Sequence, residues 1–448
     1  MKDSLAASLT TALEELRPSE LVRPHLPAEE PALILAVGKA ALSMLSAARA
    51  EFPSVPWIAT PPRNPASASR AVVHQDGLGL IAAGSHPLPD EHSVAAANLA
   101  LERTGSQAAD DSVLLLVSGG GSALWCAPHG VTLQEKRLVV DQLLRSGADI
   151  FELNAVRKNL SRIKGGRLAA QVKGRILSLV ISDVPGDNLS VVASGVAFPG
   201  TESFADALAV LDKYQIPAPA ARSHLERGTR GEVPASPSVS DPVWQRVENR
   251  LIGSNRQLLM AAKRYWETQG YPVVVVSDRF QGEARDVAQA HAIAIRHLRA
   301  GGRFEELPRL MNSGHLLLAM SPGALNSEGA VVLVSGGETT VNVKGSGRGG
   351  RNQEFALWLL HFLGHDGVWA ISAGSDGIDG NSDAAGAILR PDSFMRASAL
   401  GLDSGDFLAR NDSYSFFEAI GDRVMTGPSG NNLNDYRAVM VPRGSGKA

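Results

Sequence analysis

The sequence predicts an α/β protein with two domains, each a mostly parallel sheet with flanking helices. Short aliphatic runs typical of buried strands alternate with longer helical patterns, and most of the runs end in glycine, serine or aspartate. At 448 residues the chain also exceeds what one hydrophobic core usually holds. Ligands bind such sheets at the loops that follow the strands, so a functional site is expected there, in a cleft between the domains.

Composition is typical of a soluble enzyme. Hydrophobic residues make up 44% of the chain and charged residues 20%. Basic and acidic residues nearly balance, 43 against 46, which argues against nucleic acid or a membrane surface as the main partner. The single cysteine, Cys126, is expected to be a buried, inert thiol in a reducing compartment. No apolar run reaches the roughly 18 residues of a membrane span, and the N-terminal stretch is an amphipathic helix, so a cytoplasmic protein is expected.

The linker between the domains is expected at residues 228–241, which are rich in Gly, Pro and Ser. This places a Rossmann-like domain at 1–240 and a second α/β domain at 241–448. Residues 60–70 contain three prolines and are expected to form a loop. The expected strands are 33–37, 113–117, 176–181, 331–334, 368–372 and 438–441, and the expected helices are 92–103, 133–145, 154–172, 283–300 and 352–362.

Lys39 follows the first strand in the sequence GKAA and is expected in the first turn of the next helix. A cation there opposes the helix dipole unless an anion lies beside it, which favours a phosphate or carboxylate contact over a solvated lysine. GxxxxGK[ST] does not occur in the sequence, so any nucleotide is held in another way. His86 follows another strand end, where it is a candidate for catalysis or for a hydrogen bond within a turn.

A glycine-rich turn, Ser118, Gly119, Gly120, Gly121 and Ser122, directly follows the strand 113–117. Three glycines at the end of a buried strand have no packing rationale, which favours a backbone cradle for phosphate over a structural turn.

Two carboxylates follow the strand 176–181 in the sequence ISDVPGDN. Asp183 and Asp187 therefore lie at the expected ligand edge, where carboxylates serve as general bases or magnesium ligands. The helix expected at 154–172 carries Lys158 and Arg162 on one face. This face is either solvated or directed partly into an anion site.

Residues 331–354, VVLVSGGETTVNVKGSGRGGRNQE, carry the most specific pattern in the chain. The strand is expected to break at 335–338, and the six glycines from Gly336 to Gly350 are expected to leave backbone N–H groups free for an anion. Arg348 and Arg351 add two permanent cations that can bind an anion through two hydrogen bonds. A loop further on, GSDGIDG, contributes further acids, among them Asp376.

Glycine cradles, cations and acids together suit phosphoryl transfer, which needs charge and positioning more than covalent catalysis. In this interpretation Lys39, Arg348 and Arg351 face the phosphates and Asp183 is the base. Asp187 and the acids of the GSDGIDG loop hold magnesium.

Two other functions stay open at this point. Gly345, Gly347 and Gly350 spell the GxGxxG of a dinucleotide-dependent oxidoreductase, although the acid that should follow about 20 residues later is misplaced. A non-enzymatic module that binds sugar acids would also use cations, but it leaves the acids without a purpose.

The sequence resembles the class II glycerate 2-kinases, a family whose C-terminal part is called the MOFRL domain and whose members are often labelled hydroxypyruvate reductases. The resemblance covers almost the whole chain. It rests on the segments AVGKAA (36–41), GSHPLPDE (84–91), VSGGGSAL (117–124), NAVRKNLSRIKGGRLA (154–169), ISDVPGDN (181–188), GSNR (253–256), SGGETTV (335–341), GRGGRNQEFAL (347–357) and GSDGIDG (374–380).

The resemblance implies phosphorylation of D-glycerate at its 2-hydroxyl by ATP and Mg2+; a related small sugar acid and hydroxypyruvate reduction with NAD(P)H are the alternatives. It implies a MOFRL-type region at about residues 325–440, a hydroxy acid and a nucleotide as partners, no nucleic acid or membrane, and leaves a homodimer open. The expected site residues are Lys39, Asp183 and Arg351 for catalysis; Arg348, Asn352, Glu354 and His86 for substrate; Ser118, Gly119, Gly120, Gly121, Ser122, Asn255, Gly336, Gly337, Glu338 and Thr339 for nucleotide and phosphate; and Asp187 and Asp376 for metal.

Two departures from the family pattern bear on substrate choice. Val196, Ala197 and Phe198 stand where a GPT-type turn and an acid are usual, and Ser429 and Asn431 stand where threonines are common. A larger apolar residue near the pocket would change which hydroxy acid fits.

Overall fold

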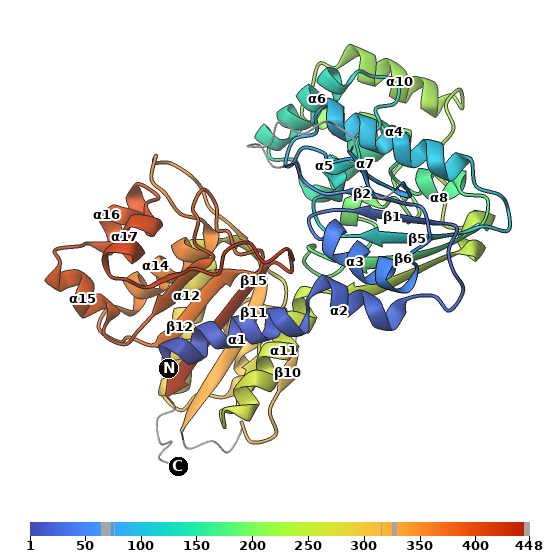
Figure 1. Ribbon diagram of the computed structural model, residues 1–448. Helices are drawn as coiled ribbons and strands as arrows, with labels where there is room; N and C mark the ends of the chain where they lie inside the picture. The colour runs from blue at the N-terminus through green and yellow to red at the C-terminus, as the bar shows by residue number, and fades with distance from the viewer. Residues whose placement is uncertain (64–72, 76, 315, 325–328, 443–448) are drawn as a thin grey trace. The chain divides into compact units, whose positions relative to one another are not determined.

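The computed structural model (Figure 1) describes residues 1–63, 73–75, 77–314, 316–324 and 329–442. It divides into two compact units, one of residues Pro18–Gly253 and the other of Met1–Arg17 with Ser254–Ala448. The chain thus passes between the units twice, after Arg17 and after Gly253. The domain limits expected from the sequence, 1–240 and 241–448, stay a prediction. The expected linker 228–241 lies within the unit Pro18–Gly253, and helix α1 (Lys2–Glu15) belongs to the other unit.

A seven-stranded sheet forms the centre of the unit Pro18–Gly253. All neighbouring strands are parallel except the edge pair β3–β4. The order is β3 (Val73–Gln75), β4 (Gly79–Ile81), β2 (Trp57–Thr60), β1 (Leu33–Val37), β5 (Ser112–Val117), β6 (Arg175–Ile181) and β7 (Val247–Gly253). Every residue of β1 is buried, as expected for a strand covered on both faces.

Helices cover both faces of this sheet. Figure 1 shows α3 (Ala41–Glu51) on one side and α4 (Glu91–Gly105) with α8 (Arg167–Gln171) on the other. Capping boxes begin several of these helices; in α4 the Asp90 carboxylate accepts from the Ser93 amide, and in α6 Thr132 and Glu135 pair in the same way. The remaining helices are α2 (Pro18–Val22), α5 (Gly121–Leu124), α6 (Leu133–Arg145), α7 (Ile150–Asn159), α9 (Phe204–Lys213) and α10 (Pro219–Thr229), with short 3-10 turns at Arg23–His25, Val192–Ser194 and Pro242–Arg246.

Several local predictions for this unit need correction. The single helix expected at 154–172 is two helices, because Gly165 and Gly166 take left-handed backbone angles between α7 and α8. Lys39 lies in the turn before α3 rather than inside the helix. Strand β7, which follows the linker candidate, was not foreseen; its outer residues are polar and partly exposed, so it lacks an apolar run. Most of the loop expected at 60–70 falls outside the described residues.

The second unit contains an eight-stranded mixed sheet. Strand β11 runs parallel to β8 and β9, whereas the pairs β11–β15, β12–β15, β12–β13 and β13–β14 are antiparallel. The α/β class and the two-domain fold are confirmed, but a mostly parallel second sheet is wrong. The strands are β8 (Val273–Val275), β9 (Phe280–Glu283), β10 (Ala319–Met320), β11 (Ala330–Thr340), β12 (Trp369–Gly374), β13 (Gly386–Leu389), β14 (Arg423–Val424) and β15 (Asp435–Pro442).

Two pairs of helices pack on opposite faces of this sheet, α12 with α14 and α1 with α11 (Figure 1). The Ser8 hydroxyl of α1 lies 2.8 Å from the Tyr436 hydroxyl of β15, and both residues are buried. The N-terminal helix is therefore part of this unit's core. The helices are α11 (Asn255–Thr268), α12 (Ala284–Arg299), α13 (Leu307–Leu310), α14 (Arg351–Leu363), α15 (Ser393–Ala399), α16 (Ser404–Ala409) and α17 (Ser413–Ala419), with a 3-10 turn at Phe304–Glu306.

Strand β11 is longer than the sequence suggested. Residues 335–338 do not break it, because Gly336 and Gly337 keep their register with Tyr436 and Asp435 of β15 and the strand reaches Thr340. The irregular loop therefore begins at Val341.

Candidate functional site

The turns that follow β1 and β5 lie side by side and are joined by hydrogen bonds. The Ser118 amide donates to the Val37 carbonyl at 2.9 Å, and the Lys39 amide donates to the Gly119 carbonyl at 2.8 Å. The Ser118 hydroxyl also accepts a hydrogen bond from the Ala40 amide at 3.0 Å. A Cβ on Gly38 would come within 2.1 Å of the Ser118 hydroxyl, so only glycine allows this contact.

Three side chains that the sequence predicts to be functional come from the ends of different strands and lie beside the glycine-rich turn Ser118–Ser122. A Cβ added to Gly119 would lie 2.0 Å from the Asp183 carboxylate, so that carboxylate packs directly on the turn. A Cβ on Gly120 would lie 3.1 Å from the His86 ring and 3.5 Å from Lys39 Cγ. The parallel sheet explains this convergence, since it brings the strand ends to one edge.

The three glycine amides of this turn take no part in the hydrogen bonds of the described residues. Within the described ranges, the N–H groups of Gly119, Gly120 and Gly121 donate to no acceptor. Gly120 has a left-handed φ of 84°, which turns successive amides toward the same side. Such a concave array of N–H groups, with a lysine and a histidine beside it, can hold an anion.

Asp187 lies beyond Asp183 in the turn after β6. Its amide donates to the Val184 carbonyl at 2.9 Å, and its φ of 56° is uncommon for a residue other than glycine. Across the described residues, no group of three or more His, Cys, Asp or Glu side chains is arranged to hold a metal ion. A metal here would need ligands from its substrate as well.

Two of the basic residues in the segment 154–167 are buried rather than solvated. Lys158 is 1% exposed and forms an ion pair with Glu202 at 2.8 Å. Lys164 is equally buried and donates to the Ser122 carbonyl at 2.6 Å. Burial and neighbouring cations lower the pKa of Lys164 well below its ordinary value. Arg162 alone of the pair on the expected face stays at the surface, donating to Asn98 at 2.6 Å.

In the other unit, Arg351 is fixed by two carboxylates at the start of α14. Its Nε donates to Asp435 at 2.8 Å and its Nη1 to Glu338 at 3.1 Å. Burial alone would lower the pKa of Arg351, but the charges of Asp435 and Glu338 raise it above its ordinary value. The Arg351 side chain is 31% exposed, so part of it stays accessible while the two ion pairs set its orientation.

Asp435 is the centre of this network and is fully buried. It also accepts hydrogen bonds from Asn352 Nδ2 at 2.9 Å, from the Thr339 amide at 3.2 Å and from Arg437 at 2.7 Å. Burial opposes the ionised form, yet Arg351 and Arg437 hold the pKa of Asp435 below its usual range. The carboxylate therefore stays charged between two guanidinium groups.

Asp379, from a later loop, caps the first turn of α14, which contains Asn352. The Asp379 carboxylate accepts from the amides of Asn352 at 3.0 Å and Gln353 at 2.8 Å, which is the role of an N-cap. Burial raises the pKa of Asp379 to about 6 in spite of these hydrogen bonds. Asp376 accepts from the Ile378 amide at 3.2 Å within the same loop.

Asn255 ties β11 to β15. Its Nδ2 donates to the carbonyls of Leu433 at 2.5 Å and Asp435 at 2.9 Å, and its Oδ1 accepts from the Gly337 amide at 3.2 Å. A Cβ on Gly336 would come within 1.9 Å of Asn255 Oδ1. The predicted nucleotide role of Asn255, Gly336, Gly337 and Thr339 stays a prediction, while their contacts here link the two strands.

The loop Val341–Gly350 uses its amides inside the protein. The amides of Lys344 and Gly345 donate to Asn411 Oδ1 at 2.7 and 2.9 Å. Further along, the Gly347 amide donates to the Arg410 carbonyl at 3.0 Å, and the Gly349 amide donates to Asn381 at 2.8 Å. The expectation that the glycines leave these N–H groups free is therefore wrong. A Cβ on Gly345 would lie 2.2 Å from the Arg410 carbonyl oxygen, so close packing explains this glycine.

Two further predicted side chains, one in this loop and one in α14, differ in exposure. Arg348 is 54% exposed and lies over the Tyr414 ring at 4.1 Å, with Asp383 at 3.8 Å. Glu354 is 7% exposed and accepts from Asn411 Nδ2 at 3.1 Å. Burial raises the pKa of Glu354 to about 7, so this carboxyl titrates near neutrality.

Comparison with known proteins matches two parts of the chain to protein families. Residues 4–226 match a domain of unknown function, DUF4147, and residues 331–435 match the MOFRL family. The chain is 38% identical over 363 residues to the D-glycerate 2-kinase of Thermotoga maritima, covering 80% of this chain and 79% of the relative. A crystal structure of glycerate kinase from Thermotoga maritima matches with a TM-score of 0.81 and 32% identity, covering 98% of this chain and 99% of that chain.

The chain belongs to the glycerate 2-kinase family.

Relatives of this family carry two kinds of name. A protein of Agrobacterium vitis that is 41% identical over 363 residues, covering 80% of this chain and 86% of the relative, is named a putative hydroxypyruvate reductase. The GxGxxG match that would suit a reductase lies in Gly345–Gly350, where the amides of Gly347 and Gly349 are already bonded within the protein. These amides are therefore not available to bind the pyrophosphate of a dinucleotide, as a GxGxxG turn would require.

Asp435 and Arg437 were missed in the sequence. They stand in LNDYRAVMVP, where a polar loop runs into an apolar strand. Two opposite charges directly before an apolar run were the available signal, since charges buried in a strand need partners. Arg437 is fully buried and lies 4.8 Å over the Phe355 ring, which contributes to the core of this glycerate 2-kinase family member.

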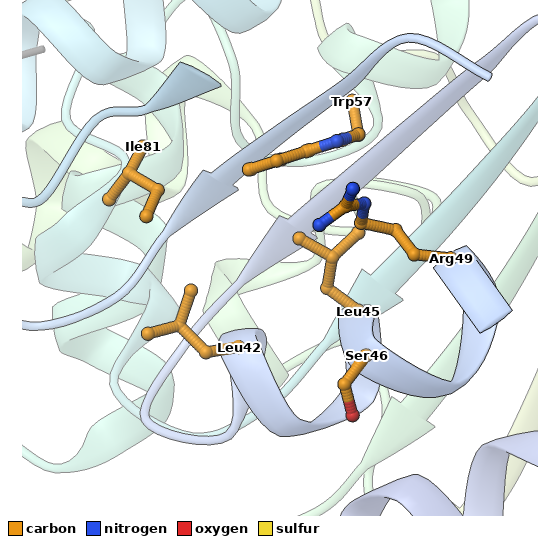
Figure 2. A pocket seen from close by; sticks show the side chains of 6 residues that line it. All are labelled: Leu42, Leu45, Ser46, Arg49, Trp57 and Ile81. Atoms are coloured by element: carbon orange, nitrogen blue, oxygen red, sulfur yellow. The ribbon is translucent and has the colours of Figure 1, made fainter. Parts of the chain in front are cut away.

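A small pocket lies apart from these residues, between α3 and the strands β2 and β4 (Figure 2). It has a volume of about 210 Å³ and is lined by Leu42, Leu45, Ser46, Arg49, Trp57 and Ile81. The Arg49 guanidinium lies 4.9 Å from the centre of the Trp57 ring. None of the predicted site residues lines it.

Proposed function

We propose that the protein transfers the γ-phosphoryl group of ATP to the 2-hydroxyl of D-glycerate, giving 2-phosphoglycerate and ADP. Membership of the glycerate 2-kinase family supports the substrate. The observation that carries the mechanism is the convergence of Asp183, His86 and Lys39 on the open amides of Gly119 and Gly120.

In this proposal Asp183 is the general base. It takes the proton of the 2-hydroxyl as the hydroxyl oxygen forms a bond to the γ-phosphorus and the bond to the bridging oxygen of ADP breaks. A carboxylate packed on Gly119 is held by the strand end of β6, so it needs no rearrangement to act.

Lys39 and the amides of the turn would bind phosphate oxygens. The amides supply fixed hydrogen-bond donors, and Lys39 supplies a full positive charge. His86 is proposed to bind the substrate beside Gly120. Arg351 is the second catalytic cation and Arg348 a substrate contact; the exposed edge of Arg351 suits charge that develops on the transferring group.

Mg2+ fits the donor set only together with ATP. This ion is usually held by one or two carboxylates and by phosphate oxygens, and it keeps several waters. Asp187 and Asp376 are the proposed ligands, and the ion would neutralise the charge of the β- and γ-phosphates when bound.

Substrate choice among small hydroxy acids depends on the residues around the turn. Ala193 and Ala197 are buried with Val196 in the segment that packs on the turn, and a Cβ on Gly121 would lie 2.8 Å from Ala193 Cβ. We propose that a larger apolar residue in this segment would change which hydroxy acid fits beside the turn.

A coupled assay tests the function. The protein is incubated with ATP, Mg2+ and D-glycerate, and enolase is then added without a mutase. We expect phosphoenolpyruvate to appear, because enolase acts on 2-phosphoglycerate directly. If ATP is untouched while NADH is consumed with hydroxypyruvate, the proposal is wrong.

Cellular location and assembly belong to the same proposal. No helix in the described ranges has the length and apolar character to cross a membrane. A cytoplasmic enzyme that forms a homodimer is proposed, and cell fractionation with light scattering of the purified protein tests both points.

A further inference from the structure

A chain of polar groups connects Ser122 of the glycine-rich turn to Ser194 and Asn154, two residues with no role in the site described above. Ser122 Oγ lies 2.8 Å from Ser194 Oγ, and Ser194 Oγ lies 3.0 Å from the side-chain amide of Asn154. Ser194 and Asn154 are buried, at 0% and 1% exposure, whereas Ser122 is partly exposed on the turn. The chain therefore leads from the interior to the proposed phosphate site.

The backbone that carries Ser194 is strained. Ala193 and Ser194 have φ angles of 49° and 57°, in the left-handed region that residues other than glycine rarely adopt. The Gly165 amide donates to the Ser194 carbonyl at 3.1 Å, which holds this conformation in place. Strain of this kind persists where the surroundings fix it, and it is frequent at ligand sites.

The direction of the hydrogen bonds follows from Asn154. With Oδ1 toward Ser194, both N–H groups of Nδ2 are buried and have no partner within the part of the chain that the structure describes. Rotating the amide by 180° places Nδ2 toward Ser194, so that one N–H group and the oxygen lack a partner instead of two N–H groups. Unpaired buried N–H groups are the rarer case, and the oxygen and nitrogen of an amide are assigned from such networks.

In the rotated arrangement the donors run outward. Asn154 Nδ2 donates to Ser194 Oγ, so the Ser194 hydroxyl hydrogen is free to donate to Ser122 Oγ. The Ser122 hydroxyl then has its own hydrogen available for a ligand on the turn. In the opposite arrangement Ser122 donates inward to Ser194 and can only accept, which suits no phosphate oxygen.

We propose that Asn154 and Ser194 are positioning residues that turn the Ser122 hydroxyl into a donor for a phosphate oxygen of ATP. This inference rests on the proposed function for the identity of the nucleotide. Lys164 supports the same turn from behind, since its ammonium donates to the Ser122 carbonyl at 2.6 Å. Hydrogen bonds in such a series strengthen one another, so the last donor is stronger than an isolated hydroxyl.

The test measures the affinity of ATP with Mg2+ by calorimetry, without glycerate, so that no turnover occurs. Removing the donor in Ser122→Ala is expected to weaken binding about 10- to 100-fold, as for a hydrogen bond to a charged group. Ser194→Ala is expected to show most of this loss, and the double variant no more than Ser122→Ala alone. Fully additive losses, or an unchanged affinity in Ser194→Ala, would overturn the proposal.

Asn154→Asp provides a second test that keeps the size of the side chain. Its carboxylate can only accept, so it reverses the relay, and we expect ATP affinity to fall about 10-fold or more while kcat at saturating ATP changes less than about 3-fold. An ATP affinity equal to that of the wild type overturns the relay. Ser46→Ala, on the surface of α3 with its hydroxyl bonded to the Ser43 carbonyl, is the matched control and should leave affinity unchanged.

The outcomes separate this inference from the proposed function. If D-glycerate is phosphorylated but none of the three substitutions changes the affinity for ATP, the relay is wrong and the proposed function stands. Coupled effects on ATP binding without phosphorylation of D-glycerate mean that the relay stands and the substrate is wrong. Absence of ATP binding by the wild-type protein overturns both.

Discussion

Two glycine-rich segments of similar sequence serve opposite purposes in this protein. Both follow a buried strand, LLLVSGGGSALW at β5 and VVLVSGGETTVN at β11. At the first, the chain turns and the amides of Gly119–Gly121 find no acceptor in the described ranges. At the second, the strand continues through both glycines in register with β15, and the loop beyond bonds its amides internally.

The difference lies in what surrounds each segment. The turn Ser118–Ser122 follows β5, a central strand, at the carboxyl ends of the parallel strands, which is where ligands bind such sheets. The loop Val341–Gly350 lies against the segments 379–381 and 410–414, whose carbonyls and side chains accept its amides. Glycine therefore marks either an open amide or a close backbone contact, and the composition of a loop cannot distinguish them.

The largest effect is expected at the open turn. Asp183→Asn removes the proposed base, and kcat should fall about 10²- to 10⁴-fold. ATP affinity should change little, because the carboxamide keeps the shape that packs on Gly119. Steady-state kinetics with D-glycerate check this, and Asp141→Asn on the exposed face of α6 is the control. Normal turnover in Asp183→Asn would contradict the role of Asp183.

A substitution of Arg351 tests whether the second glycine-rich segment, whose amides are bonded internally, contributes side chains to catalysis. Arg351→Lys keeps the charge but removes the fork that bonds Asp435 and Glu338 together. We expect turnover to fall at least ~10²-fold. Arg348→Lys, at a half-exposed position over Tyr414, should lose about 10-fold or less. Unchanged kinetics in Arg351→Lys would refute its assignment.

A pair of glycine substitutions separates binding from stability. In Gly120→Ala the methyl group projects toward His86 and Lys39 at the mouth of the turn, so ATP affinity should fall about 10-fold or more, with a stability loss of about 1 kcal/mol from the left-handed φ. In Gly345→Ala the methyl group meets the Arg410 backbone, so the free energy of unfolding should fall by about 1–3 kcal/mol with ATP affinity kept.

Calorimetry and denaturant titration measure the two quantities for each variant. The comparison fails if Gly345→Ala weakens ATP binding while Gly120→Ala loses only stability.

The smallest effect concerns pH and Glu354. Its pKa is about 7 in the folded protein against an ordinary 4.5, because burial disfavours the charge. The folded state therefore keeps a proton that the unfolded chain releases, and this contribution to stability is full below pH 4.5 and is lost as pH rises through 7. Glu354→Gln should be more stable than the wild type at pH 8, on the order of 1–3 kcal/mol, and nearly equal at pH 4.5.

Thermal unfolding of both proteins at the two pH values checks this. Asp379, whose pKa burial raises to about 6, adds a slope of the same sign to both proteins, so the difference between them isolates Glu354. An equal gain at both pH values would show that burial of the charge is not the cause.

What the sequence predicted well is what a parallel sheet imposes. Lys39, His86 and Asp183 each follow a different strand, and the rule that strand ends share an edge brought them together before any coordinates. The strands β1, β5 and β6 and the helix α14 were placed within one or two residues because their apolar patterns are strong.

What the sequence did not predict depends on partners far along the chain. The amides of Gly345 and Gly347 find acceptors more than sixty residues later, at Asn411 and Arg410. Asp435 stabilises Arg351 across a similar separation. No local pattern shows such pairings. The antiparallel return of β15, which carries Asp435, breaks the alternation of strand and helix on which the parallel expectation rested.

The most direct test of the account is the amide spectrum of the protein labelled with 15N-glycine, recorded with and without ATP and Mg2+. The account predicts that the resonances of Gly119, Gly120 and Gly121 shift on binding, whereas those of Gly345, Gly347 and Gly349 stay in place. Shifts confined to the second group, with the first unmoved, would contradict it.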